Sequence, residues 1–127
     1  MENTYFKGES PKKDWGFVLC LLAMLLFSIF GIGIDIDQYL QAKDGDLEIP
    51  VWYFYLIFSI DVLIVLSVVL LYFYRKIGGY LFPVATLAHF ISHLYYLDTF
   101  LYSDVTALFL YVGIGLLAIL PKWQFFK

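Results

Sequence analysis

Apart from Asp104, at the edge of the last apolar segment, three ionisable residues lie inside long apolar segments of the sequence: Asp61, His89 and His93. An aspartate at the centre of a membrane helix costs about 2.5–3.5 kcal/mol on insertion scales, so such residues normally face a bundle interior or a cavity. His89 and His93 are four positions apart, which places both side chains on one face of a helix. These three residues are the candidates for chemistry within a membrane.

The pair of Asp61 and His89 allows two interpretations. In the first, the two side chains hydrogen-bond each other and fix the register of two helices, a type of contact worth about 0.6 kcal/mol on average. In the second, a buried carboxylate beside a histidine binds a proton or another cation. The second interpretation predicts a small proton- or cation-linked transporter or channel.

A third interpretation uses His89 and His93 as ligands of a transition metal or a haem in a redox membrane subunit. Two histidines at this spacing can hold one ion, and a carboxylate can add a ligand or orient one. Iron or copper sites for membrane oxidation need more histidines than this sequence offers, and a haem held between two helices would need a histidine from a partner subunit. We therefore predict no cofactor from the sequence alone.

Other kinds of site have little support. Ser92 does not share the helix face of His93, and the sequence has no glycine-rich phosphate loop and no CxxC pair, so we do not expect an enzyme. The single Cys20 lies in an apolar run, where it serves as a small hydrophobic residue. A net charge of −3 without a basic stripe excludes a nucleic-acid partner.

The composition is that of a membrane protein. Of the 127 residues, 62% are hydrophobic and 15% are charged, whereas soluble domains have about 45–50% apolar and about 25% charged residues. Four apolar runs are long enough to cross a bilayer. The sequence therefore predicts an all-α, integral membrane four-helix bundle with up-down topology and a single domain over residues 1–127. The spans are 15–34, 51–74, 80–97 and 101–120, and Gly78 and Gly79 are predicted to make the short turn between the second and the third.

The basic residues predict the orientation. Seven of the eight lysines and arginines fall on one side of the predicted spans, and only Lys43 falls on the other. This bias predicts that both termini are cytoplasmic, in the inner or plasma membrane of the cell. The seven are Lys7, Lys12, Lys13, Arg75, Lys76, Lys122 and Lys127.

An acidic segment follows the first predicted span. An EF-hand loop that began at Asp35 would need an oxygen ligand and a glycine where Tyr39 and Leu40 stand, so a calcium site is not expected. We instead predict a solvated outer loop from residue 35 to residue 49. Its acidic residues are Asp35, Asp37, Asp44, Asp46 and Glu48.

The depths of the polar residues match. Asp61 lies about 15 Å along the second span from its outer end, and His89 lies about as far into the third span from the inner end. An antiparallel hairpin of these spans would bring the two side chains together. Small and polar residues also mark contact faces on the other two spans: Cys20, Met24, Ser28 and Gly31 on the first, and Ala107, Tyr111 and Gly115 on the fourth.

Four helices barely enclose a solute pathway. From the sequence, the leading expectation is an accessory or structural subunit of a larger membrane complex, or a homo-oligomer. The transporter and the redox subunit are the alternatives.

Overall fold

The chain is all-helical in the computed structural model, which describes residues 8, 10–45, 48–97 and 102–127. The four helices are long and apolar enough to cross a membrane, as the sequence predicts. They are α1 (Trp15–Lys43), α2 (Val51–Tyr72), α3 (Lys76–Leu97) and α4 (Tyr102–Lys122), and a 3-10 turn, η2 (Trp123–Phe125), follows α4.

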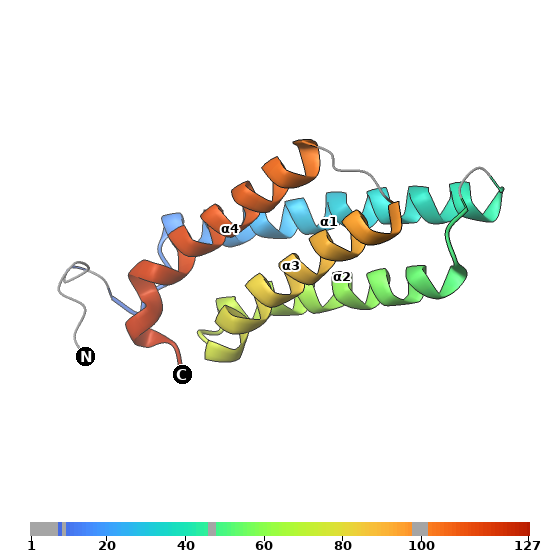
Figure 1. The fold of residues 1–127 in the computed structure, drawn as a ribbon. Helices are drawn as coiled ribbons and strands as arrows, with labels where there is room; N and C mark the ends of the chain where they lie inside the picture. The colour runs from blue at the N-terminus through green and yellow to red at the C-terminus, as the bar shows by residue number, and fades with distance from the viewer. Residues whose placement is uncertain (1–7, 9, 46–47, 98–101) are drawn as a thin grey trace.

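Consecutive helices run in opposite directions (Figure 1). α3 packs closely along α2, whereas α4 lies against α1 and diverges from α3 toward its own N-terminal end (Figure 1). Gly78 permits the close approach of α2 and α3. A Cβ atom at this position would lie 2.7 Å from Leu70 Cβ and 3.0 Å from the Ser67 carbonyl oxygen.

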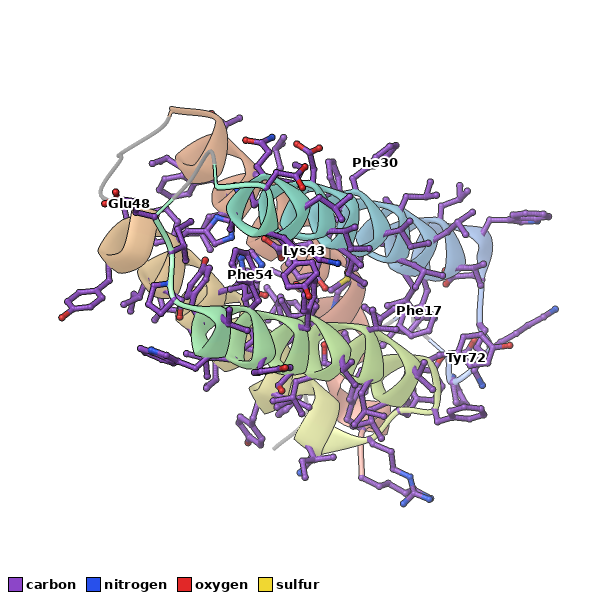
Figure 2. The ribbon with its side chains drawn as sticks, turned by 90° about the vertical axis from the view of Figure 1, so that its right-hand side faces the viewer. Phe17, Phe30, Lys43, Glu48, Phe54 and Tyr72 are labelled. Carbon is purple, nitrogen blue, oxygen red and sulfur yellow. The ribbon has the colours of Figure 1, made fainter. Side chains whose placement is uncertain are left out.

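The first helix is longer than predicted. It continues to Lys43, so the prediction that the segment from Asp35 is a loop is wrong for residues 35–43. The reason is packing: Tyr39 and Ala42 lie against a buried cluster on α2, and the ring of Tyr39 meets Phe54 at a centroid distance of 5.3 Å. Figure 2 shows Phe54 between α1 and α2, and Phe30 pointing away from the bundle.

The turn between α2 and α3 also differs from the prediction, which placed it at Gly78 and Gly79. Both glycines lie inside α3. The turn is made instead by Tyr74, whose φ of 56° is left-handed, while the Arg75 N–H donates to the Leu70 carbonyl at 3.0 Å, as in a Schellman cap. The Tyr74 ring contacts aromatic side chains from both ends of the chain: Phe17, Phe125 and Phe126.

Lys122 joins the end of α4 to the start of α1. Its side chain is 2% exposed, and Nζ donates to the carbonyl oxygens of Ser10 at 2.8 Å and Lys12 at 3.1 Å. It also pairs with Asp14 Oδ2 at 2.8 Å. Asp14 Oδ1 meanwhile accepts from the Phe17 N–H and caps α1. The Lys122 ammonium, and then the Phe17 N–H, lower the pKa of Asp14.

The lowered pKa predicts a pH dependence of stability. The pKa of Asp14 is lower in the folded chain than in the unfolded one. The Asp14–Lys122 ion pair therefore contributes its full stabilisation of the fold above the ordinary pKa of 3.8, and this stabilisation is lost as the pH falls through the lowered pKa. Asn can still cap the helix, so Asp14→Asn should remove only the charge. We expect the melting temperatures of wild type and Asp14→Asn to differ at pH 6 and to converge toward pH 3. A constant difference across this range would contradict the assignment.

Gly115 allows α4 to reach the core. A Cβ atom there would lie 2.6 Å from two ring atoms of Phe82 and 3.3 Å from Met24 Cε, whereas one at Gly113 would have no atom within 4 Å. We expect Gly115→Ala to lower the free energy of unfolding by about 1–3 kcal/mol through overpacking. Gly113→Ala should be neutral or stabilise by up to about 1 kcal/mol through helix propensity. Denaturant titration in detergent measures both, and equal effects would show that α4 is not packed as described.

Candidate metal centre

Asp35 is the hub of a cluster of ionisable side chains. Its side chain lies on α1 and the residue is 0% exposed. Its two carboxylate oxygens each face one histidine of α3: Oδ2 lies 2.8 Å from His89 Nε2, and Oδ1 lies 2.8 Å from His93 Nε2. Because a carboxylate only accepts hydrogen bonds, both imidazoles donate from Nε2 in this arrangement.

Asp61 joins the same cluster from α2. Its Oδ1 lies 3.1 Å from His89 Nε2, so the predicted contact between the second and third spans is present. Asp61 is 5% exposed, and its other oxygen, Oδ2, is buried without a hydrogen-bond partner in the part of the chain that the structure describes. A single nitrogen of His89 therefore faces two carboxylates.

The three helices present these side chains for local reasons. His89 and His93 are one helical turn apart on α3, and their ring centroids lie 4.4 Å from each other. Asp35 continues a stripe on α1 that includes Met24 and Ser28, at intervals of three and four residues, and this stripe faces the bundle. One helix thus supplies both nitrogens and the other two helices supply the carboxylates.

The ligand atoms fit a metal ion. Those of Asp35, His89 and His93 all lie within 4.8 Å of one another. A tetrahedral ion with ligand distances of about 2.0–2.2 Å separates its ligands by about 3.3–3.6 Å, which is about 0.5–0.8 Å more than the 2.8 Å contacts of Asp35. The oxygen of Asp61 beside His89 offers a fourth ligand.

The charges of the cluster allow a cation to bind. Among the described residues, the salt-bridge partners of Asp35 and Asp61 are the two histidines, with no lysine or arginine. With neutral imidazoles, the cluster holds two buried negative charges. Buried charges are ordinarily paired or coordinate a metal, so either protons on the two imidazoles or one divalent ion would neutralise this site.

A cavity of about 230 Å³ adjoins the cluster. Asp61, His89 and His93 form part of its wall. Hydroxyl groups of Ser28, Thr86 and Tyr111 form another part, and the rest is apolar. The cavity thus adjoins both proposed nitrogen ligands, and where Asp61 leaves the fourth position of the ion open, a further ligand could reach it from this side.

The other acidic residues of the segment after Ile34 lie apart from the cluster. Asp37 is exposed and accepts a hydrogen bond from Gln41 Nε2 at 2.7 Å. Asp44 and Glu48 are also exposed, and Asp46 lies outside the described residues.

The sequence does not predict Asp35 as a site residue, because the apolar run before it ends at Ile34. The signal was nevertheless present, because the contact stripe of Met24, Ser28 and Gly31 reaches Asp35 at the next helical interval. Asp61, His89 and His93 were singled out, and the structure brings all three together with Asp35. Proton, cation or metal binding by these residues stays a prediction.

Both histidines lie on α3, so they could ligate a haem iron from one helix only, as the sequence indicates. No protein family, curated protein or solved structure matches the chain.

Proposed function

We propose that this small membrane protein binds one divalent transition-metal ion between α1 and α3, with Asp35, His89 and His93 as ligands. The observation that carries the proposal is the pair of 2.8 Å contacts from the Asp35 carboxylate to both histidines. Two imidazoles and a carboxylate are a ligand set suited to ions such as Zn²⁺ or Fe²⁺, while Ca²⁺ and Mg²⁺ prefer oxygen ligands alone.

A contact that only fixes helix register needs less than this cluster contains. One carboxylate and one histidine would suffice to fix the register, and such a contact stabilises the helix pair by about 0.6 kcal/mol. Here two carboxylates and two histidines from three helices converge, and one buried oxygen of Asp61 has no hydrogen-bond partner among the described residues. Removing charges from water costs several kcal/mol per ion unless they are compensated. A bound divalent ion supplies that compensation.

The proposal also fixes the depth of the site. If the basic residues are cytoplasmic, Asp35 lies about 30 Å along α1 from its inner end, and Asp61 lies about 15 Å along α2 from its outer end. The ion would then lie between the middle of the membrane and its outer surface. The predicted roles as a complex subunit, homo-oligomer or transporter remain predictions, and the metal site is compatible with each of them.

Metal analysis of the purified full chain tests the proposal. The protein in detergent is dialysed against Zn²⁺, Co²⁺ or Ca²⁺, and the bound metal is measured by mass spectrometry. We expect one Zn²⁺ or Co²⁺ per chain and no Ca²⁺. The doubly substituted Asp37→Asn, Asp44→Asn protein, which loses exposed carboxylates, should bind the same amount. A site with a binding free energy of about −8 kcal/mol would be half filled at micromolar free Zn²⁺. Binding of less than about one tenth of an ion per chain at this concentration would refute the proposal.

A further inference from the structure

We infer that the cavity beside the metal centre binds the hydroxyl end of a neutral, lipid-soluble alcohol, with the alcohol oxygen on the metal. This inference rests on the proposed metal site and names the class of molecule that the site takes. Three features of the cavity carry it: its size, its apolar surroundings and its pattern of hydrogen-bond donors and acceptors.

The cavity is large enough for part of an organic molecule. Its volume is about 230 Å³, whereas an engineered protein cavity of about 150 Å³ binds benzene. Polar residues of the cluster form one part of its wall, and Phe27, Phe90 and Leu108 contribute apolar side chains to the rest. A molecule with one polar end and an apolar chain matches this division.

The surroundings of the cavity select a molecule that arrives from the lipid. Phe27 lies about 18 Å along α1 from Trp15, within the hydrocarbon region of a spanning helix. Phe30, also in the cavity wall, is 69% exposed and points away from the bundle (Figure 2). No lysine or arginine lines the cavity in the described part of the chain. A hydrated ion or a polar solute would lose its water here without replacement.

The helix arrangement leaves a side entrance. The residues that α4 contributes to the cavity, Ala107, Leu108 and Tyr111, all come from the N-terminal half of this helix. That half is the part that diverges from α3 (Figure 1). The apolar chain of a ligand can therefore extend between α3 and α4 toward the bilayer while its polar end faces the histidines.

Charge and hydrogen bonding favour an alcohol over other polar ends. A divalent ion with Asp35 and Asp61 is already neutral, so a carboxylate ligand would bring an uncompensated charge. The hydroxyls of Ser28 and Ser67 donate to backbone carbonyls at 2.8 and 2.6 Å, so the Tyr111 hydroxyl, which contacts both serines, donates its single hydrogen to one of them. The Tyr111 oxygen then keeps a lone pair that can accept the hydrogen of a hydroxyl group, which an ether or a ketone lacks.

The visible spectrum of Co²⁺ tests the inference, because it changes when a ligand joins the ion. The Co²⁺-loaded protein in lipid nanodiscs is titrated with 1-decanol, and with decane as the matched control for partition into the bilayer. We expect a saturable spectral change with 1-decanol and none with decane. Ala107→Phe, which fills the cavity, should weaken the response to 1-decanol at least about tenfold, or about 1.4 kcal/mol. Thr106→Phe introduces the same phenyl ring on an exposed position outside the cavity wall, and this variant should respond to 1-decanol as wild type does.

Both variants should still bind one Co²⁺ per chain, because neither residue belongs to the metal cluster. If Co²⁺ binds but its spectrum ignores 1-decanol, or if Ala107→Phe responds as wild type does, the alcohol site is refuted and the metal site stands. If wild-type protein binds no Co²⁺, the metal site itself is refuted, and the alcohol site with it.

Discussion

Asp35→Asn is expected to lower the affinity of the protein for Zn²⁺ by more than about 100-fold. Loss of a residue that only orients a metal ligand typically costs 10–100-fold in affinity, and Asp35 both supplies a ligand oxygen and contacts both histidines. Asn has nearly the same shape, so the packing of α1 should persist. Competition with a chromophoric chelator measures the affinity of the wild type and the variant.

The matched control is Asp37→Asn, two positions further along the same helix. Asp37 is exposed and its carboxylate accepts from Gln41, outside the cluster. This variant should bind Zn²⁺ within about threefold of wild type, a difference of less than 1 kcal/mol. Asp61→Asn should fall between the two, with a loss of about 10–100-fold, because Asp61 borders the three proposed ligands, through its contact with His89, without being one of them. If the Asp35→Asn protein binds Zn²⁺ as tightly as the Asp37→Asn protein does, Asp35 is not a ligand of the metal.

The second large effect is stabilisation of the fold by the metal. An ion that binds only the folded chain adds about 2.7 kcal/mol to the free energy of unfolding at 100 times its dissociation constant, and about 4.1 kcal/mol at 1,000 times. The added free energy of unfolding should apply to the whole bundle and not to one helix, because the proposed ligands join α1 to α3. We therefore expect the melting temperature of the wild type to rise with the logarithm of the free Zn²⁺ concentration.

His93→Gln separates this linkage from ordinary packing. Gln can still donate a hydrogen bond to Asp35, but it is a poor ligand for Zn²⁺. The variant should therefore fold, and its melting temperature should respond to Zn²⁺ no more than that of wild type in excess chelator. If the variant and the wild type respond to Zn²⁺ by the same amount, the ion binds elsewhere on the chain.

Much of the fold follows from simple properties of the sequence. Hydropathy predicts the four helices, and the depths of Asp61 and His89 in an antiparallel hairpin predict their contact, which the structure shows at 3.1 Å. These features depend on local composition and on helix geometry, which a single sequence contains.

The features that the sequence did not predict depend on contacts between helices. Asp35 was assigned to a loop because acidic residues follow it, yet the packing of Tyr39 and Ala42 against α2 continues the helix for another two turns. The turn before α3 was assigned to Gly78 and Gly79, yet aromatic packing around Tyr74 places it earlier. Hydropathy registers neither kind of contact.

X-ray absorption at the zinc edge, on full-length protein loaded with one equivalent of Zn²⁺, tests the metal centre most directly. Asp35, His89 and His93 predict two imidazole nitrogens and one or two carboxylate oxygens at about 2.0–2.2 Å, with the outer-shell scattering of both imidazole rings. His93→Gln should lose one ring from this pattern. A coordination shell of oxygens alone, as the exposed carboxylates of Asp37, Asp44 and Glu48 would give, would contradict a metal site in the bundle.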